Sequence, residues 1–270
     1  SSDATTVSSD KDLDIPALCK YAESKGIGLM VYVNQRALVQ QLDILLPLYK
    51  KWGLKGIKFG FVQIGNQRWS TWLHDAVRKC GEYNLMVDIH DEYRPTGFSR
   101  TYPNLMTQEG IRGNEEMPDA THNTTLPFTR YLAGAGDYTL CYFNNRVKNT
   151  KAHQLAMAAV YYSPLQFMFW YDRPEFYQGE EELEFWKAIP SVWDDSRALD
   201  GEIGEYIVQA RRSGNDWFVG AMTNTEARTI TLTTDFLEPG KKYMLHLYED
   251  DDKLNTRTKV RSTHKKIKAG

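Results

Sequence analysis

Residues 85–97 read LMVDIHDEYRPTG, an almost wholly apolar run that ends in a cluster of ionisable side chains. The run Leu85–His90 lacks polar alternation, which is typical of a strand buried on both faces of a parallel sheet. Carboxylates at the carboxyl end of such a strand are placed for acid and base chemistry. A loop salt bridge among Asp91, Glu92 and Arg94 explains the same segment equally well.

The sequence before this strand repeats one pattern, a helical segment followed by an apolar strand. Gly26 and Gly53 are typical helix terminators because glycine accepts positive φ. Consecutive units of this kind predict a parallel sheet with helices on its outer face. The expected helices are Ile15–Lys25, Leu38–Trp52 and Trp69–Glu82, and the expected strands are Ile27–Val33, Gly56–Val62 and Leu85–His90.

Three further strands are expected downstream, at Leu105–Glu109, Asp137–Phe143 and Leu165–Tyr171, with a helix at Thr150–Tyr162. Six strands are two short of a closed (β/α)8 barrel, which typically takes about 250 residues. We therefore predict a partial (β/α)8 barrel over residues 1–190, with its chemistry at the carboxyl ends of the strands.

After Pro190 the sequence changes to short strands of two-residue period separated by turns. This texture predicts a small antiparallel β-sandwich over residues 191–270. The charged tail from Asp250 to Gly270 is expected to form an exposed strand or a frayed terminus. The expected strands are Tyr206–Arg211, Trp217–Thr223, Arg228–Thr233 and Tyr243–Glu249.

Composition excludes several classes of function. The chain has 33 basic and 35 acidic residues, a net charge of -2, which offers no strong field for nucleic acid. No apolar run is long enough to suggest a membrane span, and residues 1–10 do not resemble a signal peptide. Its 7 Trp and 16 Tyr suit stacking on sugar rings, although core packing accounts for such aromatics as well.

A second cluster of possible chemistry lies in TQEGIRGNEE, residues 107–116. Glu109 and Glu115 flank two glycines, which let the backbone pass close to a ligand. Paired carboxylates on neighbouring barrel strands are what glycosidic bond cleavage needs, and equally what Ca2+ needs. Surface acids near a turn remain an alternative. His122 and Asp137 are further candidates for the same rim.

The ordered motifs DIHDEYRPTGFSRTYPNLMTQEGIRGNEE and HNTTLPFTRYLAGAGDYT resemble glycoside hydrolase family 97, bacterial α-glucosidases and α-galactosidases. GIKFGF, YYSPLQ, VWDD and GEIGEYIVQARR extend the resemblance over almost the whole chain. It implies an amino-terminal β-sandwich, a (β/α)8 barrel and a carboxyl-terminal β-domain. We therefore expect an amino-terminal domain and two barrel strands in a longer protein, an oligosaccharide substrate, and a periplasmic or secreted location.

The resemblance assigns roles residue by residue. Glu115 matches the general acid and Glu109 a Ca2+ ligand. Asp91 stands where inverting members have a glutamate that binds Ca2+ and activates water, and Glu92 is the second candidate for that base. These matches imply a Ca2+ site of Asp91, Glu109 and Glu115. His90 and Arg94 match the surrounding rim, and His122 and Asp137 are expected to contact sugar hydroxyls.

Two departures from the family pattern bear on mechanism. Retaining members carry an aspartate nucleophile where this sequence has Gly60, and glycine cannot form a glycosyl ester. Inverting members supply a second basic glutamate where this sequence has Asn34 and Gln35. The residues therefore permit only inversion. Alternative hypotheses are a carbohydrate-binding relative that has lost turnover, and a structural protein that binds another chain.

Overall fold

The computed structural model describes residues 13–269 and divides into two compact units. The first unit runs through Arg112 and includes the short segments Ala133–Tyr138 and Ser163–Leu165. The second unit holds the remainder of the chain from Gly113 onward. Within the described part of the chain, no helix has both the length and the apolar character needed to cross a membrane.

The first unit is built on a four-stranded parallel sheet in the order β1-β2-β3-β4. Helices precede each of the first three strands, which confirms the predicted alternation. The strands are β1 (Met30–Asn34), β2 (Gly56–Gly60), β3 (Met86–Ile89) and β4 (Leu105–Gln108), and the helices are α1 (Ile15–Ser24), α2 (Gln35–Trp52), α3 (Gln67–Glu82) and the 3-10 turn η1 (Phe98–Arg100).

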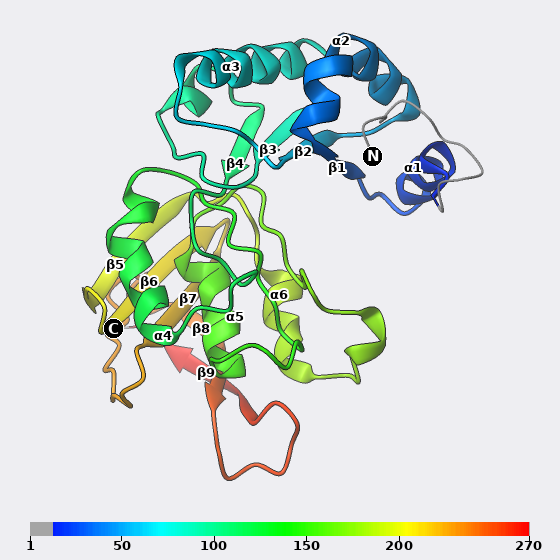
Figure 1. The fold of residues 1–270 in the computed structure, drawn as a ribbon. Coiled ribbons are helices and arrows are strands. Elements are labelled where there is room, and N and C mark those ends of the chain that lie inside the picture. Colours follow the sequence, from blue (N-terminus) through cyan, green and yellow to red (C-terminus); the bar gives the residue numbers. More distant parts are fainter. Residues whose placement is uncertain (1–12, 270) are drawn as a thin grey trace. The chain divides into compact units, whose positions relative to one another are not determined.

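Helices α2 and α3 cover one face of this sheet (Figure 1). Asn34 caps α2 by accepting a hydrogen bond from the Arg36 backbone N–H at 2.9 Å, and Gly53 ends the helix at φ 91°. Ile57 and Phe59 of β2 are fully buried in the apolar core that this helical layer forms with the sheet. Because side chains alternate along a strand, Lys58 lies on the opposite face.

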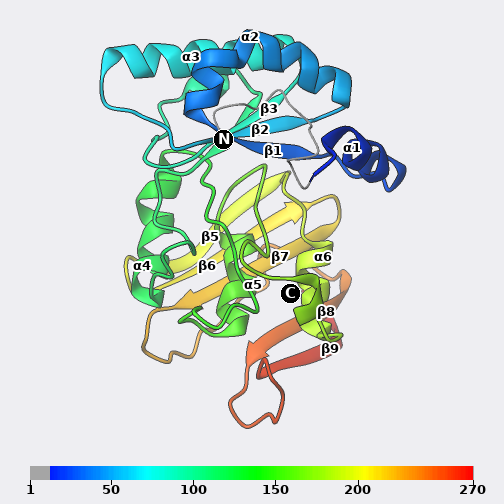
Figure 2. The same ribbon diagram turned by 45° about the vertical axis from the view of Figure 1, so that its right-hand side comes forward.

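The second unit combines helices with two antiparallel sheets. One sheet has the order β5-β6-β7 and the other pairs β8 with β9. Helix α5 packs on β7 (Figure 2), where a side chain at Gly220 would meet the Ala156 carbonyl oxygen at 2.6 Å. The elements are α4 (Ala120–Thr125), α5 (Lys151–Val160), α6 (Glu184–Ala188), β5 (Asp195–Glu202), β6 (Tyr206–Ser213), β7 (Asp216–Thr223), β8 (Lys242–Asp250) and β9 (Val260–Lys268), with 3-10 turns at Leu126–Phe128, Arg130–Leu132, Pro174–Phe176 and Glu181–Leu183.

The predicted strands Asp137–Phe143 and Leu165–Tyr171 are wrong, so the parallel sheet has four of the six expected strands. Both segments break extended geometry at a left-handed residue, Thr139 with φ 58° and Phe169 with φ 58°. The Asp172 carboxylate also accepts hydrogen bonds from three consecutive backbone N–H groups, residues 142–144, which cannot then join a ladder.

The carboxyl-terminal prediction was right about antiparallel pairing and wrong about one strand. Arg228–Thr233 forms no strand, because Arg228 turns back to bind Glu205 and Asn224 through its guanidinium. Strand β5, for which no strand was predicted, pairs with β6. Strand β9 lies within the charged tail, where an exposed strand was one of the two expectations.

Candidate functional site

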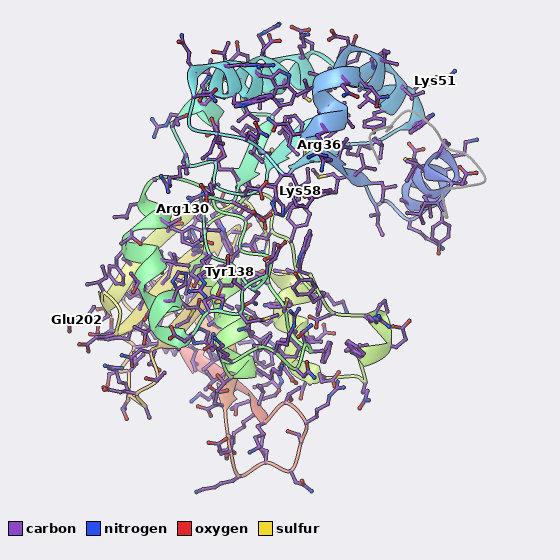
Figure 3. All side chains as sticks on the ribbon, in the orientation of Figure 1. Arg36, Lys51, Lys58, Arg130, Tyr138 and Glu202 are labelled. Atoms are coloured by element: carbon purple, nitrogen blue, oxygen red, sulfur yellow. The ribbon has the colours of Figure 1, made fainter. Side chains whose placement is uncertain are left out.

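A buried cation and three carboxylates form the centre of the first unit. Lys58 Nζ lies 3.1 Å from Asp88 Oδ2 and 3.5 Å from Glu109 Oε1, and it forms an ion pair with Asp137. Lys58 comes from β2, where Figure 3 labels it, and Asp88 comes from β3. Their backbones are paired in register, so alternation places both side chains on the face that α2 and α3 leave free.

The charges of this cluster depend on one another. Burial works against the charge of Lys58, but Asp88, Asp137 and Glu109 outweigh it and raise the lysine's pKa. Burial, helped by the neighbouring Asp137, raises the pKa of Asp88 against the opposing effect of Lys58. Because three carboxylates face a single ammonium group, Lys58 holds together groups that would otherwise repel one another.

Glu109 follows β4 and connects this cluster to the edge of the sheet. Its Oε2 accepts a hydrogen bond from the Asp91 backbone N–H at 2.6 Å and lies 3.2 Å from His90 Nδ1. Burial raises the pKa of Glu109 to about 7, although Lys58 and His90 act to lower it. A carboxyl group with such a pKa can give or take a proton near neutral pH.

Asp91 turns the chain at the end of β3. Its φ of 64° is left-handed, a conformation that asparagine and aspartate adopt more readily than most residues. The turn brings Oδ1 to 3.0 Å from His90 Nδ1 and lets Oδ2 accept a hydrogen bond from the Val62 N–H at 2.6 Å. Close by, a side chain at Gly110 would lie 2.5 Å from the Tyr93 carbonyl oxygen, so the glycine allows the loops after β3 and β4 to meet.

The structure therefore brings together four of the residues singled out from the sequence: His90, Asp91, Glu109 and Asp137. Glu92 and Arg94 are exposed. The described residues hold no ion pair that joins Asp91, Glu92 and Arg94, so the loop salt bridge considered above is not formed.

Glu115 and His122 belong to the second unit. Glu115 is half-buried in the segment before α4, and His122 lies in that helix, where its backbone N–H donates to the capping carboxylate of Asp119 at 2.9 Å. The meeting of Glu115 with Asp91 and Glu109 remains a prediction.

Lys58 and Asp88 were not among the site residues predicted from the sequence. Both interrupt strands that are otherwise apolar, GIKFG and MVDI, and both are buried. A lysine inside a buried strand is rare unless a carboxylate pairs with it. The lysine in GIKFG could therefore have been used to predict acidic partners on the neighbouring strands, at the same level of the sheet.

The donor set of Asp91 and Glu109 fits a hard cation. His90 Nδ1 lies between the two carboxylates, 3.0 Å from one and 3.2 Å from the other, so this point already favours positive charge. Each carboxylate oxygen has two lone pairs and keeps one after accepting a single hydrogen bond. Oxygen donors of this type are those that Ca2+ collects.

The first unit belongs to the class of parallel α/β folds, with carboxylates at the ends of its strands. The family description "Glycoside hydrolase 97" matches residues 1–111, and "Glycosyl-hydrolase 97 C-terminal, oligomerisation" matches residues 192–270. The chain belongs to glycoside hydrolase family 97.

Individual relatives agree with this family. "Retaining alpha-galactosidase" of Bacteroides thetaiotaomicron is 33% identical over 261 residues, which cover 89% of this chain and 39% of that protein. "Probable retaining alpha-galactosidase" of Streptomyces bingchenggensis is 33% identical over 222 residues, 80% of this chain and 35% of that protein.

A solved family 97 enzyme from Pseudoalteromonas sp. strain K8, in complex with panose or with acarbose, matches with a TM-score of 0.86 and 31% identity. The match covers 96% of this chain and 46% of that one. The chain thus spans less than half the length of each of these three relatives.

Proposed function

We propose that this chain carries residues of a catalytic site that cleaves α-glucosidic or α-galactosidic bonds. The observation that carries the proposal is the convergence of Asp91 and Glu109 on His90 at the carboxyl edge of the parallel sheet. In this chemistry one carboxyl group protonates the departing oxygen and a second activates water or attacks the sugar; Asp91 is proposed for the second role, and Glu109 for holding a cation beside it. The family membership of the chain supports the same chemistry.

In the proposed mechanism Glu115 is the general acid and Asp91 is the base, with Glu92 as the second candidate for the base. The geometry around Asp91 supports its role. The Val62 N–H donates a hydrogen bond to Oδ2, which orients the carboxylate, and Oδ1 lies 3.0 Å from His90 Nδ1. Glu92 is exposed and no such contact fixes it, which favours Asp91.

We propose further that the reaction inverts the anomeric centre, although two relatives bear names that specify retention. Retention requires a carboxylate nucleophile about 5 Å from the acid. A Cβ built on Gly60 would lie 2.0 Å from the Tyr32 ring, so the tyrosine fills the space that a side chain at position 60 would need. Neither glycine nor this tyrosine supplies the carboxylate that retention uses.

Asp91, Glu109 and Glu115 are the proposed ligands of a Ca2+ ion. When bound, the ion would supply positive charge that stabilises the ionised carboxylates of Asp91 and Glu109 and the oxygens of the substrate, while Glu115 would have to carry a proton to act as the acid. Lys58 acts from the buried side by holding Glu109 at the strand end, and Asp137 holds Lys58 in turn. The two residues thereby orient one proposed ligand. Substrate contacts from His90, Arg94 and His122 remain part of the proposal, whereas the side chain of Asp137 is buried against Lys58, so its predicted contact with a sugar would require that ion pair to open.

The substrate is proposed to be an α-linked oligosaccharide. The Pseudoalteromonas enzyme is described in complex with panose, and the two named relatives are α-galactosidases. The protein expressed from its whole coding sequence should therefore be assayed with aryl α-glucosides and aryl α-galactosides.

Paired variants test the assigned roles. Glu115→Gln should lower turnover of substrates with poor leaving groups by about 10²–10⁴-fold while sparing activated ones, because a good leaving group needs no acid. Asp91→Asn should lower turnover of both substrates, because nothing replaces the base. Glu116→Gln, at an exposed neighbouring acid, is the control. An equal loss on both substrates for Glu115→Gln would contradict its role as the acid.

A further inference from the structure

Two histidines face each other across the antiparallel hairpin that β8 and β9 form in the second unit (Figure 2). His246 and His264 are direct partners in the register of this hairpin. Direct partners on an antiparallel pair have Cβ atoms about 4.5–5.5 Å apart on the same face, so their rings can meet. Both residues belong to the second unit, as does the 3-10 turn Glu181–Leu183 beside them. None of the roles assigned above uses either histidine.

The two rings direct nitrogen atoms at one another. His264 Nδ1 lies 2.7 Å from His246 Nδ1, and the ring centroids are 4.6 Å apart. Two N–H groups would repel one another at this distance, and so would two lone pairs. The contact is therefore stable only when a single positive centre lies between the nitrogens, either a shared hydrogen or a metal ion.

Glu181 determines which nitrogen of His264 is available as a ligand. Its Oε1 lies 2.8 Å from His264 Nε2, so Nε2 carries the hydrogen and donates it to the carboxylate. The Nδ1 atom of the neutral ring then keeps its lone pair on the side of His246. Histidines that bind metals almost always donate their other N–H in this way, because the partner fixes the ring and makes the ligand more basic.

We propose that His246 and His264 bind a divalent transition-metal ion through their Nδ1 atoms, with Glu181 orienting His264. Imidazole suits ions such as Zn2+, Cu2+ and Ni2+, whereas Ca2+ and Mg2+ take oxygen ligands. When the ion binds, the hydrogen of His246 moves from Nδ1 to Nε2, which leaves both Nδ1 lone pairs for the metal.

The geometry requires a small separation of the rings. Tetrahedral Zn2+ with Zn–N bonds of about 2.0–2.1 Å holds two ligand nitrogens about 3.3 Å apart, which is about 0.6 Å more than the present distance. His264 is 37% exposed and His246 is exposed, so the rings have room to move and water can complete the coordination. The ion would join β8 to β9 at the middle of the hairpin. The proposal does not depend on the function proposed above, because its ligands are nitrogens of another unit.

Long-range proton–nitrogen NMR of the six histidine rings tests the proposal, with the two rings assigned by His246→Gln and His264→Gln. Zn2+ is added in excess Ca2+, which occupies sites made of oxygen donors. One equivalent of Zn2+ should shift both rings in a saturable manner, and either substitution should abolish the response of the ring that remains. Glu181→Gln should lower the Zn2+ affinity about tenfold, since loss of such a partner typically costs about 10–100-fold. Lys265→Gln, at an exposed neighbour on the other face of β9, should leave the affinity unchanged.

Several results would overturn the proposal. Rings that respond to pH but not to Zn2+ would show a hydrogen-bonded pair that binds no metal. An unchanged Zn2+ affinity in His246→Gln would place the ion elsewhere, and a shift confined to His90 would assign it to the carboxylate cluster of the first unit. Saturation of the same two rings by Ca2+ alone would contradict ligation by nitrogen. The substituted side chains are exposed, and circular dichroism of each variant checks that the hairpin is intact.

Discussion

Replacement of Lys58 by methionine should destabilise the first unit strongly. The lysine side chain is 3% exposed and its ammonium group contacts three carboxylates, two of which are fully buried. Methionine fills a similar volume without charge and leaves these acids uncompensated. Removal of one partner from a buried ion pair costs about 3–5 kcal/mol, and we expect a loss in that range at neutral pH.

Urea unfolding followed by circular dichroism measures this loss, with Lys79→Met as the matched control. Lys79 also contacts two carboxylates, Asp43 at 2.8 Å and Asp75 at 3.6 Å, but these lie at the surface. The control should lose less than about 1 kcal/mol. Adding Asp88→Asn to Lys58→Met should recover about 1–3 kcal/mol, because one buried charge is removed. Equal stability of the two methionine variants would refute the electrostatic account of the cluster.

Three further predictions concern the second unit. Burial lowers the pKa of His153 from 6.5 to about 4, so the folded state resists protonation of this side chain. As the pH falls from 6.5 to 4, the free energy of unfolding should therefore decrease by about 3 kcal/mol. His153→Gln should remove this decrease in urea unfolding measured over the same pH range. Gly220→Ala should lower stability by about 1–3 kcal/mol, because its Cβ would overlap the Ala156 carbonyl oxygen; a neutral result in thermal unfolding would count against the packing of α5 on β7. Arg211→Met should cost about 3 kcal/mol by the same measurement, because its guanidinium donates to the carbonyl oxygens of Ala159 and Val160; an unchanged melting temperature would contradict that role.

Local signals were enough to predict the helical layer of the first unit. Gly53 ends α2 in a left-handed conformation, as its place after Trp52 indicated. The apolar strands paired in parallel as expected, so Asp91 and Glu109 reached the same edge of the sheet. Parallel strands share the edge at which their carboxyl ends lie, and this geometry made the two acids predictable as neighbours.

Local sequence patterns could not predict contacts between residues that are far apart in the chain. Lys58 pairs with Asp137, 79 residues away, and no spacing rule links them. The segment around Leu140 looked like a strand because it is apolar, but Asp172 and left-handed residues hold it in an irregular path. Strand β5 was missed for a different reason. Most of its side chains are exposed to solvent, so its sequence lacks the alternation of apolar and polar residues that indicates a strand.

Proton NMR of the first sugar released from an aryl α-glycoside tests the proposed chemistry most directly. Gly60 and the Tyr32 ring beside it supply no carboxylate for a glycosyl ester at that position, and in the proposed mechanism Asp91 therefore acts through water. We expect the first-formed product to have the β configuration, followed by slow mutarotation. A first-formed α product would contradict this account and would show that another residue of the protein serves as nucleophile.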